Sequence, residues 1–87
     1  MSYTFAYYAS AIAPNGEAVG KKTNKALTHC VVGRKKWLFG ERRMVSVDWR
    51  PVAWSTSVER AQIRASSARS QYDELAIVEV ELWNLNN

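Results

Sequence analysis

Apolar and polar positions alternate in two stretches of the chain, one near each end. Residues 3–12 place three aromatic side chains on one face of an extended chain, and a turn at residues 14–16 follows. Residues 75–83 alternate most clearly, because one face is wholly apolar while the other also carries glutamates. The apolar face consists of Ala76, Val78, Val80 and Leu82. Both stretches are predicted to be β-strands, the second with one face in the core. The alanines of the first stretch leave a helix possible there, although its aromatic residues favour a strand.

Three shorter apolar runs in the middle of the chain predict a meander of strands. The apolar runs are residues 27–32, 37–39 and 44–49, and the turns between them are residues 33–35 and 40–43. Pro51 is expected to close the last run, since proline cannot donate a hydrogen bond to a sheet. Residues 17–25 fit no single pattern, so a mobile basic loop and a weak edge strand protected by lysines both stay open.

A helix is predicted after these strands. Thr56 and Glu59 have the spacing of a capping box, in which the Thr side chain accepts from the third residue's amide. Small or apolar side chains then recur at helical spacing, whereas Ile63 lies off that stripe. The stripe consists of Val58, Ala61, Ala65, Ala68 and Tyr72. Because it is mostly alanine, the helix is expected to lie close against a sheet.

These elements predict an α+β fold made by residues 1–87 as a single small globular domain. The expected architecture is an antiparallel sheet of four to five strands with one helix packed on one face. The expected order is roughly β-β-β-β-α-β, with neighbouring strands in the sequence paired in the sheet.

The single cysteine bears on the compartment. Cys30 cannot form an internal disulfide, and small secreted domains usually carry several, so a reducing, cytoplasmic (intracellular) location is expected. No Lys or Arg precedes the first apolar stretch, which argues against a signal peptide. No stretch approaches the length of a membrane span, so no membrane partner is expected.

Candidate catalytic and metal-binding residues are few. His29 and Cys30 are adjacent in a predicted strand, so their side chains should point to opposite faces and should not form a dyad. Glu79 and Glu81 could form a carboxylate pair, but a solvated sheet face explains them better. No glycine motif for phosphate and no cluster of metal ligands is found. The sequence therefore predicts no cofactor, no metal and no enzymatic activity.

Basic residues concentrate in the middle of the chain, where residues 21–50 carry nine Lys or Arg and two acidic residues. Turns of a meander alternate between sheet ends, so two clusters are expected, with the lysines of residues 21–25 near the arginines of residues 42–43. The candidate binding residues are Lys21, Lys22, Lys25, Arg34, Lys35, Lys36, Arg42 and Arg43. Trp37 is the candidate for stacking on a base. The pattern predicts a non-enzymatic module that engages an acidic partner, nucleic acid first, through this segment.

Binding to a protein is the alternative. Trp37, Trp49, Trp54 and Trp83 are many for so small a core, and any exposed one would mark an interface. The basic turns would then steer the chain toward an acidic protein surface. A homodimer, and the choice between DNA and RNA, also stay open.

Three segments carry a resemblance to a known class of proteins. They are residues 27–32, the Trp-Ser start of an Ala-rich helix at residues 54–61, and the Val/Glu strand at residues 76–81. In this succession the chain resembles small accessory proteins encoded by bacteriophages. Such proteins are often compact α+β domains that bind and redirect host machinery, anti-defence proteins among them. The resemblance implies a binding protein rather than an enzyme, and no functional residue is carried over from it.

Overall fold

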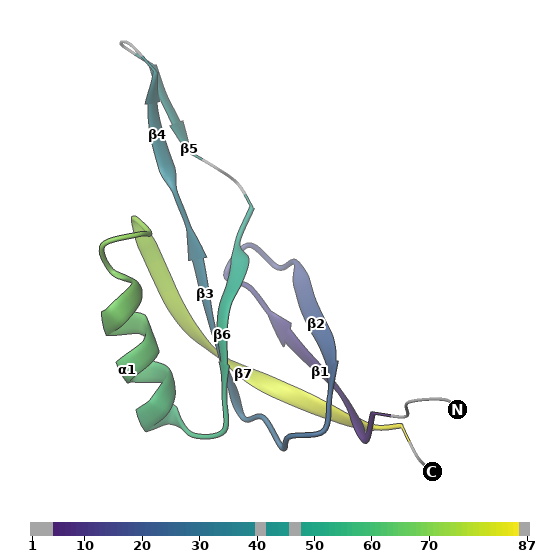
Figure 1. Ribbon diagram of the computed structural model, residues 1–87. Helices are drawn as coiled ribbons and strands as arrows, with labels where there is room; N and C mark the ends of the chain where they lie inside the picture. The colour runs from purple at the N-terminus through teal and green to yellow at the C-terminus, as the bar shows by residue number, and fades with distance from the viewer. Residues whose placement is uncertain (1–4, 40–41, 46–47, 86–87) are drawn as a thin grey trace.

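One long strand organises the sheet. The computed structural model describes residues 5–39, 42–45 and 48–85, with the backbone alone for residues 36–39 and 42–45. Its elements, in chain order, are β1 (Tyr7–Ile12), β2 (Ala18–Thr23), β3 (His29–Arg34), β4 (Lys36–Phe39), β5 (Arg42–Val45), β6 (Arg50–Ser55), α1 (Val58–Ala68) and β7 (Glu74–Asn84). Five strands form an antiparallel sheet in the order β2-β1-β7-β3-β6, and β4 and β5 form a separate hairpin (Figure 1).

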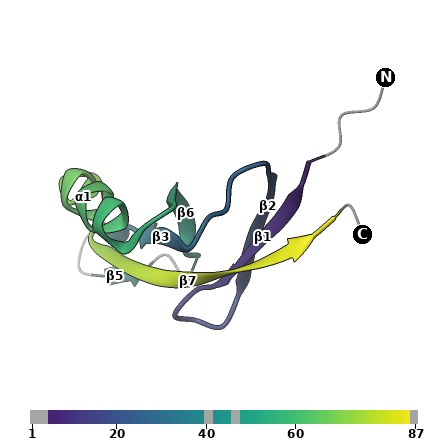
Figure 2. The same cartoon turned by 90° about the horizontal axis from the view of Figure 1, so that it is seen from below.

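The predicted fold class is confirmed, but the strand order differs from a meander. The last strand in the sequence, β7, lies at the centre of the sheet between β1 and β3. Its first half pairs with β3, from Arg34↔Glu74 to His29↔Glu79, and its second half pairs with β1. The sheet curls along β7, as Figure 2 shows from below. Backbone hydrogen bonds to β1 and β3 therefore engage both edges of β7.

The inner face of the curled sheet holds the core. Alternate β7 residues, Ala76, Val78 and Val80, pack there, so the predicted apolar face is confirmed at these three positions. The buried residues that they contact are Ala11, Ala13, Cys30, Val32 and Trp49. Most of these side chains are small, which allows strands of a tightly curled sheet to approach one another.

Helix α1 packs on the opposite face and covers only the half of the sheet formed by β3, β6 and the start of β7. The predicted stripe is confirmed at Ala61 and Ala68, which are buried, and is wrong at Val58, which is exposed. Ile63, predicted to lie off the stripe, is exposed. The predicted capping box is wrong by one residue. Ser57 is the N-cap, and its Oγ accepts from the amide of Arg60 at 3.2 Å. Serine and threonine serve equally at this position, so the sequence alone does not separate them.

Strand limits in the middle of the chain also differ from the predictions. Residues 33–35 are not a turn, since β3 continues through Arg34 and leads into β4. Pro51 does not close a strand but lies inside β6. There β6 is an edge strand, and its register against β3 shifts between Val31 and Val32, beside Pro51. Both features accommodate a residue without an amide hydrogen. The edge-strand interpretation of residues 17–25 is confirmed by β2.

Gly33 lets the helix end close onto the sheet. A Cβ atom at this position would lie 2.8 Å from Cδ1 of Tyr72 and 3.0 Å from Cδ2 of Leu75. We expect Gly33→Ala to lower the free energy of unfolding by about 1–3 kcal/mol, because the added methyl group would overpack the contact with Tyr72 and Leu75. Urea denaturation measures the change. In a Tyr72→Ala background the cost of Gly33→Ala should shrink, and an unchanged cost would contradict the packing argument.

Burial of Cys30 gives the protein a stability that depends on pH. Loss of hydration raises the pKa of the Cys30 thiol from 9.0 to about 11, and the nearby Lys21 charge partly opposes that rise. The folded state therefore holds the thiol proton more tightly than the unfolded state. Its stabilising effect is complete below pH 9 and is lost as the pH rises toward 11.

Comparison with Cys30→Ala isolates this effect from tyrosines and lysines that titrate in the same range. Between pH 8 and 11 we expect the free energy of unfolding to fall more steeply in the unaltered protein than in the variant. Chemical denaturation at closely spaced pH values measures both curves. Parallel curves would show that the thiol keeps its ordinary pKa in the folded state.

Candidate nucleic-acid interface

The predicted basic residues fall at opposite ends of the molecule. Lys25 lies in the connection that enters β3 from one end, whereas the β4–β5 hairpin with Arg42 and Arg43 extends beyond the other end (Figure 1). The prediction that these two groups lie together is therefore wrong. Its cause is the continuation of β3 into β4, which carries the hairpin away from the sheet instead of folding it back.

Arg34 and Lys35, at the hairpin end of β3, are engaged by other parts of the fold. The Arg34 Nε donates to Oε2 of Glu74 at 2.7 Å, and its guanidinium lies 4.9 Å from the ring centroid of Trp49. The Lys35 Nζ lies 5.8 Å from the ring centroid of Tyr72. Both positions are typical of cation–π contacts. Arg34 thus joins β3, β7 and the buried Trp49, a structural role that leaves less of its charge for a ligand.

Four candidates lie in the hairpin. Lys36 and Trp37 belong to β4, and Arg42 and Arg43 belong to β5, where Trp37 faces Met44 in the backbone register. Their side chains lie outside the described residues, so the roles assigned to them stay predictions.

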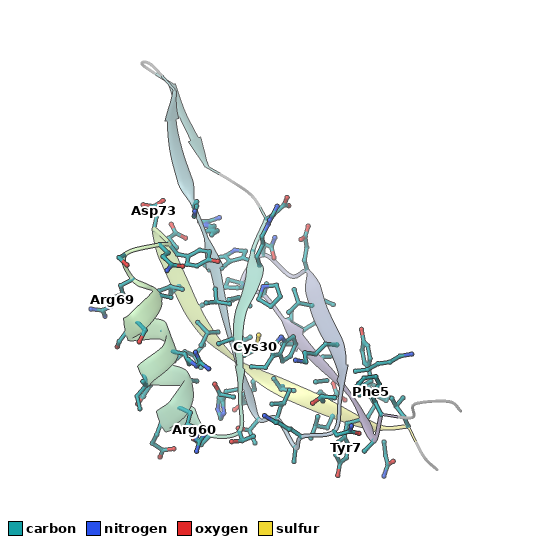
Figure 3. All side chains as sticks on the ribbon, in the orientation of Figure 1. Phe5, Tyr7, Cys30, Arg60, Arg69 and Asp73 are labelled. Atoms are coloured by element: carbon teal, nitrogen blue, oxygen red, sulfur yellow. The ribbon has the colours of Figure 1, made fainter. Side chains whose placement is uncertain are left out.

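The remaining lysines line a continuous surface with residues of the helix. One hollow lies between α1 and the segment before β3, and a second lies between that segment and β2. Lys25, Leu27 and Trp54 line both hollows, so the two adjoin along this segment, and together they are here called the basic groove. Its other lining residues are Phe5, Lys21, Lys22, Thr23, Asn24, Ser55, Thr56, Arg60, Ile63 and Arg64. Figure 3 labels Arg60 near the start of α1 and Phe5 just before β1, at the other side of the view.

Hydrogen bonds hold the segment that joins β2 to β3 against its neighbours. The amide of Ala6 donates to Oδ1 of Asn24 at 2.9 Å, and the amide of Lys25 donates to Oγ1 of Thr23 at 3.0 Å. The amide of Thr28 donates to the carbonyl of Ser55 at 2.9 Å. The buried side chain of Leu27 completes the attachment. Lys25 is therefore presented from an anchored segment, and the groove is formed before any ligand binds.

Trp54 lines both hollows of the groove. It lies on β6 directly across from Cys30 and packs against the core, yet remains partly exposed. Phe5 adds a second exposed aromatic side chain beside the lysines of β2. Two adjoining β2 residues project to opposite faces, so Lys21 and Lys22 flank the edge of the sheet on both sides.

The charge of the groove has one sign. It contains Lys21, Lys22, Lys25, Arg60 and Arg64, and none of its lining residues is acidic. Arg60 and Arg64 are four residues apart on the exposed side of α1, where like charges repel. Within the described part of the chain neither arginine is paired with a carboxylate. Such an arrangement concentrates positive potential where an anion can approach.

Three residues of the groove are absent from the candidates for nucleic-acid binding named above. Arg60 and Arg64 lie outside the basic segment at residues 21–50, and the sequence suggested Trp54 only as a contact for a protein partner. Their shared signal is spatial, since the strand order places the end of β6 and the start of α1 beside Lys25.

Other chemistry is sparse among the residues that the structure describes. His29 Nδ1 lies 2.8 Å from Oγ1 of Thr28, and the Cys30 thiol faces the carbonyl of Val31 at 3.6 Å. The described ranges contain no group of three or more His, Cys, Asp or Glu that could hold a metal ion. None of the described helical residues forms a helix long and apolar enough to cross a membrane.

Comparison of the chain with protein-family models, with curated proteins and with solved structures found no match. The geometry and charge of the basic groove are therefore the features of this chain that indicate a function.

Proposed function

We propose that this chain is a non-enzymatic module that binds single-stranded nucleic acid in the basic groove. The observation that supports this most directly is the gathering of five cationic side chains in two adjoining hollows, both of which Trp54 lines. Lysines and arginines bind phosphates and release condensed counterions, which gives affinity without sequence preference. An aromatic ring between them offers a stacking surface to any unpaired base.

The geometry favours an unpaired strand over a duplex. The bases of a duplex are stacked on one another, so Trp54 in the floor of the groove could not reach one. Of the helix, Arg60, Ile63 and Arg64 line the groove, and this short basic stretch contacts phosphates more readily than it reads base edges. This function would be exercised in the cytoplasm, where nucleic acid and the reducing conditions suited to a free thiol occur together.

Charge reversal on one helix provides a matched test of the groove. Arg64→Glu and Arg69→Glu change the net charge equally, but Arg64 lines the groove and Arg69 does not. We expect Arg64→Glu to weaken binding of labelled single-stranded DNA or RNA by about tenfold, as loss of one charged hydrogen bond implies. We expect Arg69→Glu to change it by less than about twofold, because its distant charge is screened. Fluorescence anisotropy at near-physiological salt measures both.

The salt dependence checks the number of phosphate contacts. Each neutralised phosphate of a single strand contributes about −0.7 to the slope of log K against log salt, so full use of five cations predicts a slope near −3.5. Equal losses in both arginine variants, or no saturable binding near physiological salt, would reject the groove as a nucleic-acid site. Tighter binding to an acidic protein surface would then be the alternative to pursue.

The role of Trp54 is tested by changing its aromatic ring while the charges of the groove stay the same. We expect Trp54→Phe to retain most of the affinity for a single strand, and Trp54→Leu to lose about 1–3 kcal/mol of binding free energy, the range measured for base stacking. Thermal unfolding of both variants controls for packing, since Trp54 also contacts the core. Equal affinities of two folded variants would show that the ring does not stack on a base.

A further inference from the structure

Helix α1 leaves half of one sheet face uncovered, and that half carries large apolar side chains. Beyond the helix, Trp83 and Ile12 are each 56% exposed and Tyr8 is 39% exposed. Tyr8 and Trp83 are directly opposed in the register of β1 and β7, so their side chains lie on the same face. The residues of this surface are Tyr8, Ser10, Ile12, Glu79, Glu81 and Trp83, here called the Trp83 face. Aromatic exposure of this kind marks an interaction surface more often than chance.

Tyr8 is held in position on this face. Gly20 of the edge strand lies under it, and a Cβ atom at Gly20 would be 2.7 Å from Cζ of the tyrosine. The ring therefore rests on the bare backbone of β2, as aromatic side chains do over glycines in sheets. A ring fixed in this way loses little conformational freedom when a partner covers it.

Two carboxylates give the Trp83 face a charge opposite to that of the molecule. Glu81 lies across from Ser10, and Glu79 lies across from His29. Both glutamates line a shallow hollow with Ser10 and Ile12. Within the described part of the chain neither forms an ion pair, and the one cation on an adjoining position is Lys22, on the far side of Tyr8. The chain as a whole carries a net charge of +4, so this local negative potential is distinct.

We infer that the Trp83 face docks a segment of another protein in which Lys or Arg alternates with apolar side chains. Apolar side chains of the segment would cover Ile12 and Trp83, and its cations would reach the two carboxylates and the aromatic rings. Nucleic acid is repelled by this face because its phosphates share the sign of the glutamates.

A second copy of the chain fits less well than a cationic segment. A twofold pairing places the same surface of both copies in contact. The four carboxylates of the two copies would then be gathered in one interface, and like charges brought together at an interface destabilise it. A positively charged segment of another protein is therefore the partner that fits this face best.

Nuclear magnetic resonance of the full chain tests this inference with defined peptides. The probes are acetyl-Leu-Arg-Leu-Arg-Leu-amide and the same peptide with citrulline at both arginines, which removes the charge and keeps the shape. We expect the arginine peptide to shift the amides of β1 and β7 saturably, with millimolar or tighter affinity, corresponding to at least about −4 kcal/mol. The citrulline peptide should bind at least fivefold more weakly.

Variants of the face then assign the contact. The double variant Glu79→Gln, Glu81→Gln and the single variant Trp83→Ala should each reduce the arginine-peptide shifts at least fivefold. Glu59→Gln, which removes an exposed carboxylate of α1, should leave them unchanged. Arg64→Glu should also leave them unchanged, so this test is independent of nucleic-acid binding.

Four results would overturn the inference. The first is an absence of shifts at β1 and β7 at millimolar arginine peptide. The second is equal binding of the arginine and citrulline peptides, which would mean a purely apolar patch. The third is a shift of the same amides with protein concentration alone, which would identify a second copy as the occupant. The fourth is binding that resists the glutamate substitutions.

Discussion

The backbone pairing of β7 is the constraint on which the other features of this protein depend. The strand has 11 residues, and α1, which packs on one face of it, also has 11. A strand advances about 3.3 Å per residue and a helix about 1.5 Å, so the helix spans less than half of the strand's length. No placement of α1 could therefore cover the whole of β7. The helix lies over the half that pairs with β3, and the half that pairs with β1 keeps one face in contact with solvent.

The inner face compensates for this incomplete cover by curling. Ala9 and Ala11 on β1 and Cys30 on β3 are fully or almost fully buried on the two sides of β7, and their small volume permits the sheet to bend over itself. Trp49 then fills the space that the small residues leave, and its ring receives the Arg34 guanidinium. The same bend brings the end of β6 beside the connection between β2 and β3. The basic groove thus follows from the choice of small core residues as much as from the positions of the charges.

The sequence predicted individual helices and strands better than it predicted which strands lie side by side in the sheet. Alternation of residues with period two identified the apolar face of β7, and the alanine stripe identified the buried side of α1, because both patterns report local burial. The central place of β7 was not predicted, since local patterns contain no information on which strands pair. The continuation of β3 through Gly33 was missed because glycine followed by two basic residues is typical of a turn. In fact that glycine is required by the close approach of Tyr72.

The same distinction explains the partial prediction of the candidate site. Counting charges along the chain identified Lys21, Lys22 and Lys25, which do line the groove, but it assigned equal weight to Arg34, whose charge is engaged by Glu74. Arg60 and Arg64 lie outside the basic segment of the sequence and join the lysines only through the fold. Positive potential at a surface depends on distance in space, and screening removes charges more than about 10 Å apart from one another's influence. A basic groove is therefore a property of the strand order. By occupying the centre of the sheet, β7 determines which cations meet in the groove and which carboxylates remain on the part of the sheet that α1 leaves uncovered.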